Sequence, residues 1–256
     1  MTTKKIQKRV MKMTSDDKRV MSGFPSLDKI TGGFRPGTVN VIAGRPGAGK
    51  TTFALNVAYN AATKYNKRVF IISLEESKEE LLSKIALFSL KDLSDIERYP
   101  IFIDDKYEDY EVKIVACRKA IEEIHPDLII IDYLELLTQD VRSRESRVAK
   151  ATSFLRELAT KNDVPVIVLK QLHARLILSD KPQLSDVAKI GCDTVVQESD
   201  VVIIIWWEGY TSKSREVHLA SSRNVHLDVA KNKFGDSDVE AVVKFERAKC
   251  KYYEEE

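Results

Sequence analysis

One segment of the sequence has the residue types and spacing of a phosphate-binding loop. It runs from Gly44 to Thr51, reads Gly-Arg-Pro-Gly-Ala-Gly-Lys-Thr, and fits the pattern G-x-x-x-x-G-K-[ST] at every position. Its glycines let backbone N–H groups turn toward a phosphate, while Lys50 would reach the β and γ oxygens and Thr51 would hold Mg²⁺. We therefore expect a nucleotide site made of Gly44, Arg45, Pro46, Gly47, Ala48, Gly49, Lys50, Thr51 and Thr52.

Carboxylates at the ends of two apolar runs could complete this chemistry. Asp132 ends the run Leu-Ile-Ile-Ile-Asp and has the form of a Walker B aspartate, which holds the metal ion. Glu75 lies just beyond the apolar run 69–73, where a carboxylate could orient or deprotonate an attacking water. Acidic residues are also favoured in the first turn of a helix. We therefore expect one of Glu75 and Glu76 to face the phosphates and the other to begin the following helix.

Strand-like and helix-like segments alternate around these residues. The runs that read as strands are apolar on both faces, which is typical of a parallel sheet covered by helices on both sides; they are 39–43, 69–73, 100–103, 128–132, 165–169 and 201–205. Helical periodicity is clearest over 51–62, 78–88 and 148–161. In the tail, 217–230 and 239–247 alternate polar and apolar residues, so we expect antiparallel strands at the sheet edge. The pattern predicts a doubly wound α/β fold.

The composition narrows the class of protein. A chain of 256 residues with 43% hydrophobic and 31% charged residues is typical of a soluble globular protein, and no apolar run reaches membrane-spanning length. The three cysteines are widely spread, so we expect neither a disulfide framework nor a zinc site. A net charge of +2 means that any nucleic-acid binding must come from local basic loops. We expect a cytoplasmic location and no membrane contact.

The first twenty residues differ in composition from the rest. They carry seven Lys or Arg and two acids, and Ile6, Val10 and Met13 follow a helical spacing. Two interpretations remain open: a solvated tail, or a basic arm that docks its apolar stripe on another subunit. We therefore divide the chain into an arm or linker helix at 1–20 and an ATPase domain at 21–256.

The order of several motifs resembles one protein family. Beyond the phosphate-binding loop, they are Ser22-Gly-Phe-Pro-Ser-Leu-Asp28, Ser73-Leu-Glu75, Ile131-Asp-Tyr-Leu-Glu-Leu-Leu137, Val164-Pro-Val-Ile-Val-Leu-Lys-Gln-Leu172, Ser185-Asp186, Gln197-Glu-Ser-Asp200 and Val229-Ala-Lys-Asn-Lys233. In this order they resemble the C-terminal RecA-like motor domain of DnaB-type replicative DNA helicases, which belong to superfamily 4. The resemblance covers nearly the whole chain from about Ser22 and does not include the N-terminal domain of such helicases.

The resemblance implies roles for individual residues. Glu75 corresponds to the family's catalytic glutamate, and Asp132 to its metal-associated aspartate. Gln171 corresponds to a glutamine that senses the γ-phosphate, and Lys231 and Lys233 to positions that enter the neighbouring subunit's site. Such motors use ATP and Mg²⁺ and form hexameric rings around single-stranded DNA. The basic segment 1–20 matches the family's linker helix, which packs on the adjacent subunit.

The sequence departs from the family pattern in two functional regions. Lys233 stands where the family has an arginine finger, and a lysine cannot make the forked contact of a guanidinium. Alternatively, Lys233 is an ordinary surface lysine, and Arg223 or Arg247 acts as the finger. The DNA-facing loop reads Ala-Lys-Ile-Gly at 188–191, so DNA contact is expected through Lys189 and Gly191. A second basic cluster, which includes Arg142, Arg144 and Arg147, could bind DNA phosphates or be a solvated loop.

Three functions are compatible with these observations. The first is an ATP-dependent DNA helicase motor that assembles as a ring and translocates on single-stranded DNA, in a bacterial or phage-infected cell. The alternative is a DnaB-like DNA-dependent ATPase that acts as a loader, remodelling or recombination module without unwinding. The third is a regulatory ATPase with no nucleic-acid partner, which Gln171 and Lys231 disfavour. A primase or helicase loader would be a further partner of the first.

Overall fold

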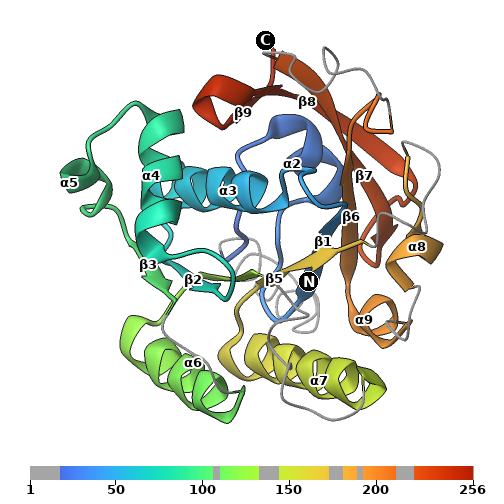
Figure 1. The fold of residues 1–256 in the computed structure, drawn as a ribbon. Coiled ribbons are helices and arrows are strands. Elements are labelled where there is room, and N and C mark those ends of the chain that lie inside the picture. Colours follow the sequence, from blue (N-terminus) through green and yellow to red (C-terminus); the bar gives the residue numbers. More distant parts are fainter. Residues whose placement is uncertain are drawn as a thin grey trace, which may run out of the picture.

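In the computed structural model, apolar strands form the central layer of an α/β fold (Figure 1). The structure describes residues 18–105, 110–132, 144–172, 181–188, 193–211 and 222–255. The strands are β1 (Val39–Gly44), β2 (Val69–Ser73), β3 (Ile101–Asp104), β4 (Leu128–Asp132), β5 (Val166–Gln171), β6 (Val201–Trp206), β7 (Ser222–Asn232), β8 (Val239–Glu246) and β9 (Lys251–Tyr253). The α-helices are α2 (Pro25–Thr31), α3 (Lys50–Tyr65), α4 (Lys78–Ser89), α5 (Leu93–Ile96), α6 (Tyr110–Ile124), α7 (Arg144–Asn162), α8 (Leu184–Ala188) and α9 (Asp193–Glu198).

The described strands form one sheet of mixed direction. Its order is β3-β2-β4-β5-β1-β6-β7-β8-β9, and the first six strands of that order pair in parallel. The tail strands β7, β8 and β9 add to the β6 edge as antiparallel neighbours. The predicted α/β fold with a mainly parallel sheet and C-terminal antiparallel strands is therefore confirmed.

Helices cover both faces of the sheet. Successive residues of a strand point to opposite faces, so each strand packs against helices on both sides. In β1, for example, Val41 packs in the core cluster that contains α6 and α7, whereas Ile42 packs in the cluster that contains α3 and α4. Figure 1 shows α3 and α4 on one side of the sheet and α6 and α7 on the other. None of the helices in the described ranges has the length and apolar character needed to cross a bilayer.

The buried core includes the residue just before the predicted boundary between residues 20 and 21. Val20 is completely buried, and its N–H and carbonyl exchange hydrogen bonds of 3.0 and 2.8 Å with Phe34. This two-residue bridge places Val20 inside the core, and the division of the chain into an arm and an ATPase domain stays a prediction. Residues 1–17, the predicted arm, lie outside the described residues, and the arm stays a prediction.

The last strand, β9, was not predicted, and it lies against the helix that follows the phosphate-binding loop. Asn56 of α3 accepts the N–H of Tyr252 at 3.1 Å and donates to the carbonyl of Cys250 at 3.2 Å. The Tyr252 ring meets Phe53 of α3 edge-on, with ring centroids 5.3 Å apart. These contacts place the C-terminal strand directly beside the first turns of α3.

Candidate active site

The phosphate-binding loop connects β1 to α3, as its sequence predicts. Gly47 and Gly49 have φ angles of 70° and 95°, a region that side-chain-bearing residues rarely adopt. A Cβ on Gly44 would lie 3.0 Å from the carbonyl oxygen of Ile205, so this strand end also needs glycine. Gly49 is the N-cap of α3 and offers no side-chain acceptor, so the first N–H groups of the helix point at the place an anion would take.

Lys50, Thr51 and Asp132 form the polar floor of the site. The Lys50 ammonium is buried and donates to the carbonyl of Arg45 at 3.1 Å. Thr51 donates its hydroxyl hydrogen to Asp132 Oδ2 at 2.7 Å. Burial raises the pKa of Asp132 to about 6. The negative charges of Glu75 and Glu76 also raise it, whereas the hydrogen bond from Thr51 lowers it. A buried carboxylate beside a hydroxyl is an oxygen set that suits a hard divalent cation.

The two acidic residues after β2 have different surroundings, and neither begins a helix. Glu76 forms an ion pair with Lys84 of α4. No described residue makes a hydrogen bond or ion pair with the Glu75 carboxylate, and the side chain is exposed on the wall of the same cavity. The prediction that one of these acids starts the next helix is wrong, because Ser77 caps α4. The Ser77 side chain accepts the N–H of Glu80, and Glu80 reaches back to the Ser77 N–H.

Sheet register places the remaining predicted residue of this group beside the loop. Gln171 at the end of β5 lies opposite Gly44 of β1, and the next N–H, from Leu172, donates to the Gly44 carbonyl at 2.9 Å. Asp132 and Ser73 are likewise opposite each other on β4 and β2. The carboxyl ends of β1, β2, β4 and β5 therefore bring together the five predicted residues Lys50, Thr51, Glu75, Asp132 and Gln171.

A cavity of about 830 Å³ opens above the loop, within the usual range for ligand pockets. The sequence did not identify the cavity wall opposite the loop, which the antiparallel strands and their connections provide. Its residues are Trp207, Tyr210, Arg223, Val225, Phe245, Arg247 and Cys250. Arg223 and Arg247 were considered only as alternatives to Lys233, and the structure places them in their own chain's cavity. The alternation of polar and apolar residues in the tail does not predict that Arg223 and Arg247 line this cavity.

Aromatic contacts connect this wall to the loop. The Tyr210 hydroxyl donates to the carbonyl of Pro46 at 2.7 Å, and the Arg45 guanidinium lies 4.7 Å from the centre of the Tyr210 ring. The Arg223 guanidinium lies 4.1 Å from the Trp207 ring centre. Burial, followed by the charge of Arg247, lowers the pKa of Arg223. The cavity thus combines a cationic, aromatic wall with the polar floor at Lys50 and Thr51.

Lys231 and Lys233 lie at the opposite end of the sheet from the loop. Gly44 at the loop end of β1 is opposite Ile205, whereas Asn40 is opposite Val201, which in turn pairs with Asn232 between the two lysines. The four steps along β1 from Asn40 to Gly44 span roughly 13 Å at about 3.3 Å per residue. Neither lysine therefore serves the cavity of its own chain.

The two lysines are held differently. Lys231 donates to the carbonyls of Val196, Gln197 and Ser199 at the C-terminal end of α9. These three bonds use all three N–H donors of an ammonium. The Lys233 ammonium contacts Asp200 Oδ1 at 3.0 Å, and its side chain is 43% exposed. In this conformation Lys233, unlike Lys231, keeps N–H donors of its ammonium for a further acceptor.

The predicted DNA-contact side chains lie outside the part of the chain that the structure describes. Arg142, Lys189 and Gly191 lie outside the described residues, and Arg144 is the first residue of α7 but its side chain is not described. DNA contact through these residues stays a prediction.

Substitution of Gly49 by alanine tests how β9 supports the loop. A Cβ at Gly49 would lie 2.1 Å from the Tyr252 hydroxyl oxygen, and the φ of 95° adds backbone strain. We expect Gly49→Ala to lower the free energy of unfolding by about 2 to 4 kcal/mol and to weaken ATP binding. Thermal unfolding and titration with a fluorescent ATP analogue would measure both effects.

Tyr252→Phe provides the matched control for this experiment. Removing the hydroxyl leaves the next ring atom 3.3 Å from the added Cβ, so the double variant should recover the part of the loss that comes from the collision. The single Tyr252→Phe variant loses one hydrogen bond to the Gly49 carbonyl and should cost about 1 kcal/mol. Equal stability of Gly49→Ala with and without Tyr252→Phe would contradict this account.

Comparison with known proteins gives a consistent family. The model of the DnaB-like helicase C terminal domain matches residues 19–91 and 84–254. The Replicative DNA helicase DnaB of Geobacillus stearothermophilus is 30% identical over 246 residues, which cover 84% of this chain and 52% of that protein. The chain thus spans about half the length of this curated relative.

Two solved structures share the fold. One is described as an ATPase domain; it has a TM-score of 0.81 at 25% identity, and the match covers 98% of this chain and 96% of that one. The other is a DnaB-like replicative helicase, described with its interactions with primase. It has a TM-score of 0.78 at 25% identity, and the match covers 93% of this chain and 63% of that one. These likenesses confirm the predicted RecA-like fold.

Proposed function

Because the chain belongs to the DnaB-like helicase C-terminal domain family, we propose that it is the ATP-driven motor of a DNA helicase. In this proposal it assembles as a hexameric ring, hydrolyses ATP at subunit interfaces and translocates on single-stranded DNA. A primase or a helicase loader is its further partner, and the cytoplasm of a bacterial or phage-infected cell is its location.

The separation of Lys233 from its own cavity is the observation that carries this proposal. The cavity is lined by Lys50, Thr51, Glu75 and Gln171, with Asp132 buried behind Thr51, but its described lining has no lysine or arginine finger from the far end of the sheet. Lys233 is half-exposed at that far end with two ammonium donors to spare. A ring in which this edge of one subunit meets the cavity of the next would bring the missing cation to the phosphates.

ATP and Mg²⁺ fit the residues present. Glycine N–H groups, the α3 N-terminus and Lys50 provide positive potential for the phosphates of a nucleotide. Thr51 and Asp132 supply adjacent oxygen donors, and a bound dication would favour the ionised form of the buried Asp132 carboxylate. Bound Mg²⁺ would supply charge neutralisation at the β and γ oxygens.

Glu75 is the residue that would act on the attacking water. Its carboxylate is exposed on the cavity wall, whereas the neighbouring Glu76 is paired with Lys84. Glu75 would orient the water and accept its proton, while Gln171 beside the loop would contact the γ-phosphate. On the opposite wall, Arg223, stacked on the buried Trp207 ring, offers a cation to the rest of the nucleotide.

Dependence of activity on protein concentration tests the assembly. We expect the ATPase rate per mole of chain to rise with concentration and to rise further on adding single-stranded DNA, since each site needs a neighbour. Mass measurements in solution, with and without nucleotide and single-stranded DNA, would follow the ring over the same range. Constant specific activity with a monomer mass throughout would contradict assembly.

A forked DNA substrate separates the proposed motor from the alternative module. Unwinding of the fork with ATP supports the helicase motor. DNA-stimulated ATPase activity without unwinding would instead support a loading, remodelling or recombination role. A salt-dependent titration with single-stranded DNA separates both from a regulatory ATPase that binds no DNA.

A further inference from the structure

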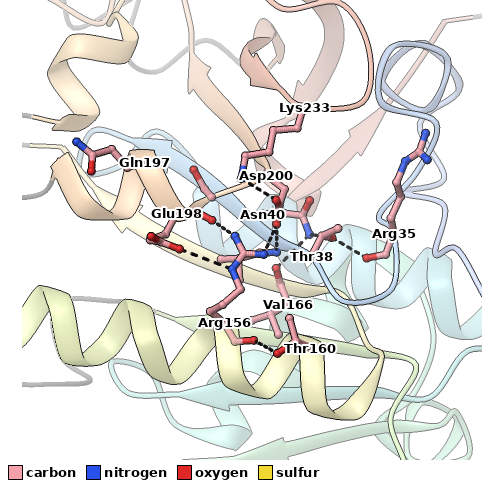
Figure 2. A network of polar contacts seen from close by, with 12 residues as sticks. Arg35, Thr38, Asn40, Arg156, Thr160, Val166, Gln197, Glu198, Asp200 and Lys233 are labelled. Atoms are coloured by element: carbon pink, nitrogen blue, oxygen red, sulfur yellow. Dashed lines mark hydrogen bonds and ion pairs between the residues drawn. The ribbon is translucent and has the colours of Figure 1, made fainter.

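Asp200 is the buried centre of a polar network at the end of the sheet opposite the cavity. Its side chain is 9% exposed and accepts three hydrogen bonds (Figure 2). Oδ2 accepts the backbone N–H of Val39 at 2.9 Å and Arg156 Nη1 at 2.6 Å, and Oδ1 accepts the Lys233 ammonium at 3.0 Å. Two of the three hydrogen bonds, from the Val39 N–H of the sheet and from Arg156 of α7, hold the carboxylate independently of Lys233.

The backbone around Asp200 and Lys233 is fixed as well. The Lys233 N–H donates to the Asp200 carbonyl at 2.9 Å, and the Asp200 N–H donates to the Val39 carbonyl at 2.8 Å. Lys233 therefore leaves the sheet from a defined backbone position, and its ammonium meets a carboxylate that is also hydrogen-bonded to Arg156 and the Val39 N–H. Figure 2 shows the Lys233 side chain extended toward Asp200.

The same network holds the C-terminal end of α9. Lys231 donates to three carbonyls there, and Arg156 donates to the carbonyl of Glu198 while pairing with Asp200. Cations at the end of a helix are favoured by its dipole and satisfy its unpaired carbonyls. Arg156 thus connects α9 to Asp200, and Asp200 connects both to Lys233.

The charge of Asp200 suits this arrangement. Burial raises the pKa of its carboxyl, but hydrogen bonds from Arg156, the Val39 N–H and Lys233 outweigh burial and lower the pKa below its usual value. The group is therefore an ionised carboxylate at neutral pH, held by three hydrogen bonds. Its two cationic partners share one buried negative charge.

We propose that Asp200 is a positioning residue that orients the Lys233 ammonium for the neighbouring subunit's ATP, an inference that rests on the proposed function of Lys233. A lysine has a flexible stem and no planar fork, so nothing in its own geometry fixes the direction of its charge. One hydrogen bond to a fixed carboxylate restricts the stem and leaves two donors for phosphate oxygens. Asp200 compensates in this way for the absence of an arginine at position 233.

Asp200→Asn is the test, because it keeps the size of the side chain and removes its charge. We expect kcat for ATP under assembling conditions to fall roughly tenfold, as for the loss of a charge-assisted hydrogen bond, with little change in ATP binding. Asp200→Glu, which keeps the charge, should recover part of the rate. Asp228→Asn is the matched control: Asp228 is an equally buried carboxylate that pairs with Lys181 at 3.4 Å, away from Lys233, and its kcat should equal that of the parent.

A double-mutant cycle separates positioning from a purely structural role. If Asp200 acts through Lys233, Asp200→Asn should cause no further loss of kcat in a Lys233→Ala background. Equal losses in both backgrounds would overturn the inference, and so would a higher kcat in Asp200→Asn, which would mean that Asp200 restrains Lys233. If Asp200→Asn does not fold, the cycle is repeated with Asp200→Glu, whose displaced carboxylate should change kcat only when Lys233 is present.

The proposed function and this inference fail in different ways. Parent-level turnover by Lys233→Ala in assembled protein would contradict the role of Lys233 and remove the basis of the inference. A large loss in Lys233→Ala together with parent-level kcat in Asp200→Asn would overturn the inference alone.

Discussion

Glu75→Gln should bind ATP about as tightly as the parent protein and hydrolyse it roughly 10²- to 10⁴-fold more slowly. The Glu75 carboxylate is exposed on the cavity wall without a described partner, so its loss leaves the phosphate-binding loop intact. A general base acts only in the chemical step, and kcat therefore falls while binding is kept. Single-turnover hydrolysis and titration with a fluorescent ATP analogue would measure the two quantities separately.

Two comparison variants make the assignment specific. Lys50→Ala removes the buried cation of the loop and should lose nucleotide binding itself. Glu76→Gln removes an equivalent charge from the adjacent residue, but from a side chain already paired with Lys84, and should keep most of the turnover. Robust hydrolysis by Glu75→Gln would move the base to Glu76 or to another residue.

The sequence predicted the phosphate side of the site because local rules determine it. The loop pattern from Gly44 to Thr51 requires a strand before it and a helix after it, and β1 and α3 have those positions. Strands that are apolar on both faces predicted a parallel sheet, and parallel strands end at one edge. Asp132, Glu75 and Gln171 therefore meet at the loop although they are far apart along the chain.

At the start of α4, two local signals in the sequence favour different first residues. Helix-dipole reasoning favoured Glu75 or Glu76 as the first residue of the helix. The sequence also contains Ser77 followed by Glu80, the S-x-x-E pattern of a capping box, and the structure uses it. A side chain that caps two N–H groups outweighs the general preference for acids in the first turn.

The wall made by the antiparallel strands could not be predicted from the sequence. Alternation in the tail indicates which residues share a face, but not which distant segment that face meets. The contact of Tyr252 with Gly49, 203 residues apart, and the position of Arg223 over Trp207 depend on how β7, β8 and β9 curl over the loop. No local pattern encodes that curvature.

Lys233→Ala should reduce turnover by roughly a thousandfold in assembled protein, with little effect on nucleotide binding or on thermal stability. Lys233 lies far from its own cavity and is half-exposed, so its removal leaves the folded subunit and its ATP site unchanged. Asp200 keeps its hydrogen bonds to Arg156 and to the Val39 N–H, which limits the cost to stability.

Lys233→Arg distinguishes a finger from a surface lysine. A guanidinium could pair with Asp200 and still present a fork to the phosphates, so turnover should stay at or above the parent rate. Lys233→Gln has similar length without charge and should behave like the alanine variant. Equal rates for arginine, glutamine and alanine at this position would make Lys233 an ordinary surface residue.

Mixing two inactive variants tests whether Lys233 acts across a subunit boundary. A Lys50→Ala subunit cannot bind ATP but still carries Lys233, and a Lys233→Ala subunit has an intact loop but no finger. Where a Lys50→Ala subunit presents its Lys233 to the cavity of a Lys233→Ala neighbour, one complete site forms. An excess of Lys233→Ala over Lys50→Ala should therefore recover activity that neither variant has alone. No recovery under conditions where the mixed assembly is seen by mass would mean that Lys233 does not complete its neighbour's site, and the cation would then have to come from Arg223 or Arg247 of the same chain, which already line the cavity.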